Sequence, residues 1–284
     1  MLGPVELVAV GVLVVVVVIW LARRSRADDA EVRRWVEATG VELSPANALA
    51  VQHYLLFSRR GRRVGALVGF ISPWVYSGIS GATIDEGGWA LSLMLVGYLL
   101  GALVAEVVVH RGRETETTAL MQPRRLVDYL SGRLLTLQRT LGVVALAMIV
   151  PYALFQPGTT TDLPGVGTIA SFALGGASIA VALEVIERRI VARRQSLADI
   201  TDVEIDDAMR STSIAMVAGA GLALLIQFAG PLVAITLAAA IPGEAGGIVA
   251  GVTIVLAFLL SLACWLNVAH PTRYRVRRLQ RSSG

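Results

Sequence analysis

The sequence predicts an all-α integral membrane protein with seven transmembrane helices: one anchor helix followed by three helical hairpins. The chain has 284 residues, of which 55% are hydrophobic and 16% charged, and its mean hydropathy is +0.67. A soluble domain carries roughly 25% charged residues. The apolar residues also gather in runs of roughly 17 to 25, the length of a helix that crosses a bilayer. Both observations favour membrane helices over a soluble core.

The distribution of arginine predicts how these helices are oriented. All 25 basic residues are arginine, and they fall only in alternate connections between the apolar runs. Positive residues in short loops stay on the cytoplasmic side, which predicts an N-terminus outside and a C-terminus inside. A chain rich in arginine, alanine and valine but without lysine is typical of GC-rich bacteria, so we expect a bacterial plasma membrane. The connections without arginine are 81–88, 156–165 and 241–246.

Four segments make up the predicted organisation. The run near 4–21 has Glu6 as its only early charge and arginines after it, which is typical of an uncleaved anchor rather than a signal peptide. The segments are the anchor helix 1–21, a cytoplasmic helical segment 22–63, a six-helix membrane bundle 64–268 and a basic cytoplasmic tail 269–284.

The first cytoplasmic segment predicts two helices. In 28–39, apolar residues recur at the spacing of one helix face, and Gly40 suits the position after the last turn. Ser44 followed by Pro45 is typical of a helix start. We expect this second helix to end near residue 58, before a cluster of arginines.

Three hairpins form the predicted bundle. A shift of 78 residues places Pro73 on Pro151 and Glu106 on Glu184, and a shift of about 80 carries Pro151 to Pro231. Repeated hairpins with proline-bent helices and unrelated hairpins of similar length both stay open. The sequence does not decide whether the fifth run is one helix or is broken at Pro231. The six runs lie near 64–80, 89–109, 140–155, 166–187, 213–240 and 247–268.

Glycine pairs at four-residue spacing predict close helix packing, either within the chain or in a homo-oligomer. These pairs are Gly65 with Gly69, Gly97 with Gly101, and Gly247 with Gly251.

An acidic stretch is the first candidate site. Its carboxylates are Asp199, Asp202, Glu204, Asp206 and Asp207. On a helix the first, second and fourth of these share a face, an arrangement suited to Mg²⁺. The stretch 199–206 resembles part of the aspartate motif of intramembrane aromatic prenyltransferases. Alanine stands in place of that motif's leading asparagine, and neither a second aspartate motif nor the family's lysine is present.

We therefore expect an acidic helix with no metal and no cofactor. Its carboxylates would pair with Arg124, Arg125 or Arg133 of the preceding arginine-rich connection, or would form a docking surface for a cytosolic partner. The residues 123–138 predict an amphipathic helix that lies against anionic lipid headgroups or packs beneath the bundle.

Two acids near the inner ends of membrane helices are the second candidate. Acidic residues within a membrane are functional candidates by default. Glu106 and Glu184 lie about one turn from Arg111 and Arg188, so ion pairing explains them as well.

The segments 97–106 (GYLLGALVAE) and 122–130 (QPRRLVDYL) resemble a pattern in uncharacterised multi-pass membrane proteins of actinobacteria. The resemblance implies a bacterial source and carries no activity. No nucleophile elbow, HExxH, Walker or CxxC motif is present, so we expect no enzyme. Topology accounts for the arginines, so we expect no nucleic acid.

The leading functional prediction is a non-enzymatic membrane component with a cytoplasm-facing surface for a cytosolic or membrane protein partner. The alternative is a permease-like carrier of an apolar or amphiphilic molecule, because bent helices and repeats recur in transporters. A lipid-modifying membrane enzyme is the third.

Overall fold

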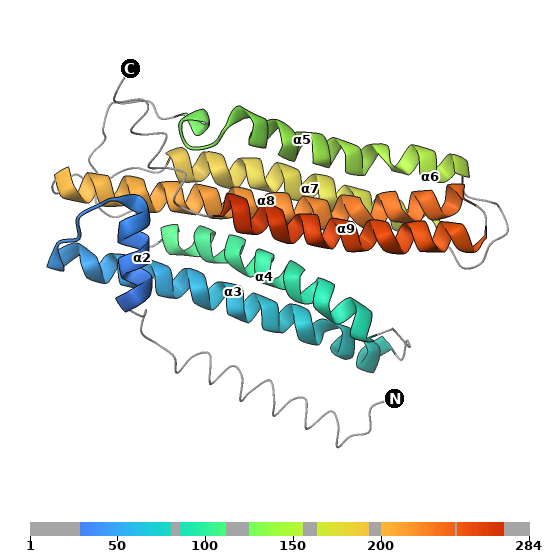
Figure 1. The fold of residues 1–284 in the computed structure, drawn as a ribbon, viewed down its shortest axis with the longest axis horizontal. Helices are drawn as coiled ribbons and strands as arrows, with labels where there is room; N and C mark the ends of the chain where they lie inside the picture. Colours follow the sequence, from blue (N-terminus) through green and yellow to red (C-terminus); the bar gives the residue numbers. More distant parts are fainter. Residues whose placement is uncertain are drawn as a thin grey trace. The chain divides into compact units, whose positions relative to one another are not determined.

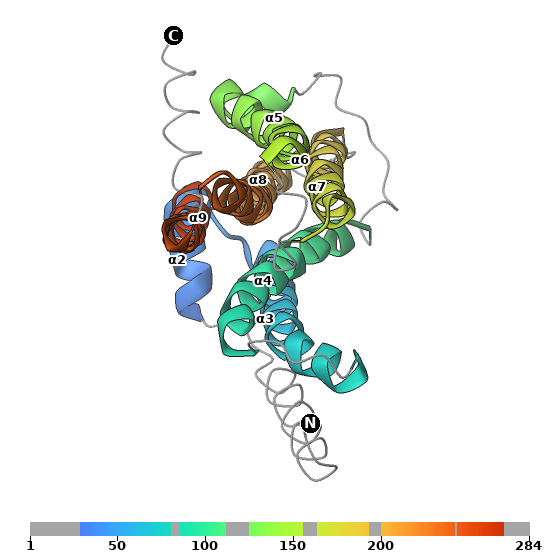
Figure 2. The same cartoon turned by 90° about the vertical axis from the view of Figure 1, so that its right-hand side faces the viewer.

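The computed structural model describes residues 29–80, 86–111, 125–155, 164–192, 200–241 and 243–269, and every regular element within them is helical. Figures 1 and 2 show these helices from two directions. They are α2 (Asp29–Thr39), α3 (Pro45–Ser80), α4 (Glu86–Arg111), the 3₁₀ turn η1 (Leu126–Asp128), α5 (Gly132–Ala147), α6 (Ile149–Phe155), α7 (Val166–Ala192), α8 (Ile200–Ala240) and α9 (Glu244–Val268).

Four helical stretches in the described part of the chain are long and apolar enough to cross a membrane. They are Gly132–Phe155, Val166–Ala192, Glu204–Ala240 and Glu244–Val268. The helix α4 adds a shorter apolar segment, Ser92–Val108. The prediction of an all-helical chain is confirmed for the described residues, and the four apolar stretches support its placement in a membrane. The anchor expected near 4–21 lies outside the described residues, and the count of seven spans stays a prediction.

The helix ends of the first polar segment form as their residues predict. Gly40 has a positive φ of 69°, and its N–H donates to the Val36 carbonyl at 2.7 Å. The Ser44 hydroxyl accepts from the Asn47 N–H at 3.3 Å and so caps α3. The prediction that this helix ends near residue 58 is wrong, because α3 continues to Ser80. Arginine is a good helix former, so the arginine cluster does not interrupt the helix.

The helices α3 and α4 pack through their glycines (Figure 1). A Cβ added at Gly65 would collide with the carbonyl oxygen of Gly97, and a Cβ at Gly101 would collide with that of Gly61. The first two predicted glycine pairs therefore bring two helices of one chain into backbone contact. The pair in α9 differs, because no atom lies within 4 Å of a Cβ added at Gly247 or Gly251.

The chain divides into two compact units. Of the described residues, the first comprises 29–111 and 200–211, and the second comprises 125–192 and 212–269. The helix α8 thus contributes 200–211 to the first unit and its remainder to the second. The boundary predicted at residue 63 falls inside α3, which is continuous there.

The second unit is a helical bundle whose helices run side by side (Figures 1 and 2). The middle of α8 is buried along its whole length between 216 and 226. Ser261 of α9 donates to the Ala223 carbonyl at 2.9 Å. Pro231 lies inside α8 without ending it, which answers the question of a break in this run. Membrane helices tolerate proline because neighbouring groups satisfy the freed carbonyl.

The prediction of one amphipathic helix over 123–138 is wrong. The structure has the short turn η1, in which the Arg125 N–H donates to the Asp128 carboxylate at 2.9 Å. Ser131 then caps α5 by accepting from the Leu134 N–H. A serine followed by glycine favours a helix start over a helix interior, and the predicted stripe overlooked this signal.

Candidate functional site

A helical cap forms one end of the first unit. We define the cap as α2, residues 45–58 of α3 and residues 200–211 of α8. Its core joins segments about 150 residues apart in sequence, so only tertiary packing brings them together. The buried core residues are Trp35, Val41, Val51, Tyr54, Ile205, Ala208 and Met209.

The cap incorporates the predicted acidic stretch as the first turns of α8. Glu204 is exposed there, and Asp207 is half-buried. Asp206 accepts a hydrogen bond from Arg210 Nη2 at 3.0 Å, and the Arg210 side chain is almost fully buried. The i,i+4 spacing was the available signal for this pair, which the sequence analysis missed. Asp199 lies outside the described residues.

The other members of the predicted surface are less fully described. Asp202 belongs to α8, but its side chain lies outside the description, as does the whole of Arg124. The other two arginines of this surface belong to the second unit, and both are exposed. Arg125 lies directly before η1, and Arg133 lies on α5. The pairing of these arginines with the acidic stretch stays a prediction.

Glu106 of α4 is fully buried against α3. Its carboxylate accepts from the Ser58 hydroxyl at 3.0 Å and from the Tyr54 hydroxyl at 3.3 Å. Both donors were missed, although their i,i+4 spacing places them on one helix face. The side chain of Arg111, the expected ion partner, lies outside the description. Glu106 therefore helps to join the cap to α4.

The second predicted acid lies at the edge of a different cluster. Glu184 of α7 pairs with Arg139 of α5 at 2.7 Å and with Arg188. The fully buried acid is instead Glu187, which accepts from Gln138 Nε2 at 3.1 Å. The same nitrogen lies 3.4 Å from the Ala218 carbonyl of α8. Three helices of the second unit thus meet at Gln138.

Glu187 was missed because the shift of 78 residues aligned Glu106 with Glu184. In space Glu106 and Glu187 correspond better, since each is buried against a polar residue of the preceding helical segment. The sequence separation is 48 residues for Ser58 and Glu106 and 49 for Gln138 and Glu187. Glu184 and Glu187 are three residues apart, so they lie near one face of α7 but about 4.5 Å apart along its axis, and a small error in register selects the wrong acid.

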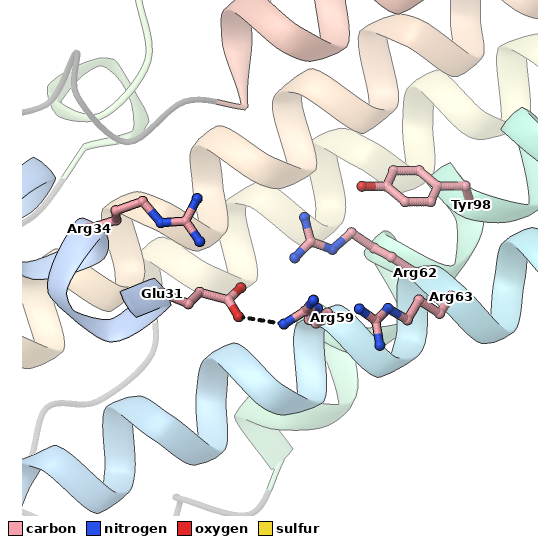
Figure 3. A pocket seen from close by; sticks show the side chains of 6 residues that line it. All are labelled: Glu31, Arg34, Arg59, Arg62, Arg63 and Tyr98. Atoms are coloured by element: carbon pink, nitrogen blue, oxygen red, sulfur yellow. Dashed lines mark hydrogen bonds and ion pairs between the residues drawn. The ribbon is translucent and has the colours of Figure 1, made fainter. Parts of the chain in front are cut away.

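A cavity of about 290 Å³ lies among α2, α3 and α4 of the first unit (Figure 3). Four arginines against one glutamate give its lining a formal charge of +3. Glu31 pairs with Arg59 at 3.0 Å. The residues that line the cavity are Glu31, Arg34, Arg59, Arg62, Arg63 and Tyr98.

Two guanidinium groups define the geometry of this cavity. Arg34 Nε donates to the Ala30 carbonyl at 3.2 Å, and Arg62 Nε donates to the Ser58 carbonyl at 3.3 Å. Figure 3 shows the two groups pointing toward one another from α2 and α3. Facing positive charges suit an anion placed between them. The sequence marked 59–63 as a basic cluster, but only the fold adds Arg34.

Comparison with known protein families, with curated protein sequences and with solved structures finds no match for this chain. Function must therefore be argued from the site itself.

Proposed function

We propose that this chain is a non-enzymatic component of a bacterial plasma membrane whose cap docks a protein partner from the cytoplasm. In this proposal the chain crosses the membrane seven times, with its N-terminus outside. The four candidate spans support the membrane location, and the alternation of arginine supports the orientation.

The packing of the cap is the observation that carries the docking role. Aromatic and aliphatic residues of α2 and α3 hold the start of α8 in place, and the buried Arg210–Asp206 pair adds a polar link along it. A surface built on packed helices loses little conformational freedom when a partner binds. Binding would therefore retain more of its interaction energy than it would on an unstructured acidic loop.

The exposed carboxylates of the cap favour a partner with a basic surface. Glu204 is exposed at the start of α8, and Glu37 and Glu42 are exposed at the end of α2 and just after it. Complementary charge accelerates association and excludes partners of the wrong sign. Asp206 is less available, because Arg210 already occupies it.

The test is native mass spectrometry of the full chain purified in mild detergent from its own membrane. We expect a stoichiometric protein partner. The substitution Glu204→Lys should reduce its retention about tenfold or more, since opposed like charges cost several kcal/mol. Glu204→Asp, which keeps the charge, should retain the partner. Deleting the whole stretch would be a poorer test, because Ile205, Ala208 and Met209 belong to the cap core.

A protein that purifies alone would contradict this function. If it also retained a small apolar molecule, the carrier alternative would be favoured. The span Gly132–Phe155 is interrupted at Met148, three residues before Pro151, and interrupted helices recur in transporters. Flux of the retained molecule into vesicles would then decide between the two functions.

A further inference from the structure

We propose that the cavity among α2, α3 and α4 binds the phosphate of an anionic phospholipid headgroup. The cavity shares α2 with the cap, but Glu204, on which the test of the protein partner depends, does not line it. The inference rests on the charge and geometry of the cavity and on the apolar surface that adjoins it.

The positive charge of the cavity favours the binding of an anion. Glu31 is paired with Arg59, so its single carboxylate does not also balance the charges of Arg34 and Arg62. Arg34 and Arg62 are the pair on which the proposal rests. Within the described residues, each donates a hydrogen bond only through Nε, to a carbonyl four residues earlier on its own helix. That bond orients the guanidinium plane and leaves the terminal nitrogens to donate to a ligand.

Guanidinium matches phosphate better than it matches a spherical anion. Two of its N–H groups donate in parallel to two phosphate oxygens, and the group remains charged at any physiological pH. Arg34 and Arg62 approach from different helices (Figure 3), so one phosphate bound by both would also link α2 to α3. The attraction of both cations to the shared anion would then offset the repulsion between them.

The size of the cavity suits a phosphate headgroup. Its volume of about 290 Å³ is slightly below that of most ligand pockets, which range over roughly 300–1,000 Å³. The acyl chains of a lipid would therefore lie outside it.

An apolar surface adjoins the cavity where those chains would run. Phe70 lies two turns beyond Arg63 on the same face of α3, and Met94 lies one turn from Tyr98 on α4. The two residues are 39% and 37% exposed. The contact between Gly69 and Leu93 shows that these two positions lie at the same level of the α3–α4 pair. Arginines beside exposed apolar residues are typical of the boundary between headgroups and acyl chains.

The experiment is a lipid titration of the detergent-solubilised full chain, followed by native mass spectrometry. The probes are dioleoylphosphatidylglycerol and, as a zwitterionic control, dioleoylphosphatidylcholine. We expect the wild type to retain the anionic lipid in preference. The double variant Arg34→Gln/Arg62→Gln should lower that retention about tenfold or more, because each loses charge-assisted hydrogen bonds.

The matched control is Arg33→Gln/Arg133→Gln, which also removes two charges, from exposed positions of α2 and α5 that do not line the cavity. It should retain the lipid as the wild type does. If the double variant lost its helical circular dichroism, Arg34→Lys/Arg62→Lys would replace it, and weaker retention is expected there because lysine lacks the planar fork.

Three outcomes would overturn the proposal. The first is equal retention of the two lipids, and the second is equal loss in the Arg33/Arg133 and the Arg34/Arg62 variants. The third is displacement of the lipid by an equal concentration of inorganic phosphate, which would identify free phosphate as the ligand. The lipid titration changes Arg34 and Arg62 and the partner test changes Glu204, so either proposal can fail without the other.

Discussion

At the residue scale, Gln138 and Arg139 are neighbours in α5, but Gln138 makes a buried polar contact and Arg139 makes an exposed one. Gln138 is buried and donates to Glu187, whereas Arg139 is 60% exposed and pairs with Glu184. Adjacent residues of a helix point about 100° apart, so one faces the bundle and the other its edge. Burial, rather than formal charge, should decide which residue matters more for stability.

We expect Gln138→Leu to lower the free energy of unfolding by about 2 kcal/mol, because it leaves the buried Glu187 carboxylate without this donor. Arg139→Leu should cost less than about 1 kcal/mol, as exposed ion pairs do. Denaturation of both variants in mixed micelles with increasing dodecyl sulfate measures the difference. An equal cost for the two substitutions would contradict this account.

At the element scale, the α3–α4 pair depends on glycine. Gly65, Gly69, Gly97 and Gly101 let two backbones touch, and each of these positions would bring a Cβ into the opposite main chain. Because the neighbour is backbone rather than a flexible side chain, a substitution must move a whole helix.

We therefore expect Gly65→Ala to destabilise the protein by about 1–3 kcal/mol, the usual cost of overpacking. Gly251→Ala is the matched control, since a Cβ there meets no atom of the chain. It should be neutral or slightly stabilising, because alanine favours helix more than glycine does. The thermal midpoint in detergent is the measurement, and equal midpoints for the two variants would count against backbone contact.

At the scale of the whole molecule, the arginine pattern makes a prediction about topology. In a Cys264→Ser background, Thr160→Cys lies in a connection without arginine and Ser282→Cys lies in the basic tail. A membrane-impermeant maleimide added to intact cells should label only the first, and lysed cells should show both labelled. Labelling of only the tail in intact cells would reverse the proposed orientation.

Some helix ends in this molecule could be predicted from local sequence patterns, and others could not. Gly40 and Ser44 set the end of α2 and the start of α3 through contacts within four residues, so the chain near them specifies the outcome. The end predicted near residue 58 failed because nothing in the arginine cluster obliges a helix to stop. The prediction of one helix over 123–138 was wrong because it gave more weight to the periodic apolar residues of this segment than to Ser131, which caps a new helix.

Composition and the spacing of residues within single helices were enough to predict the helical class, the apolar spans and the glycine faces of α3 and α4. Which acids are buried and which arginines converge depends on how the helices pack against one another. This packing places Arg34 opposite Arg62, Glu106 against Ser58 and Ile205 among the residues of α2 and α3. The physical reason is that these contacts join separate helices, and their register depends on packing that no local pattern records.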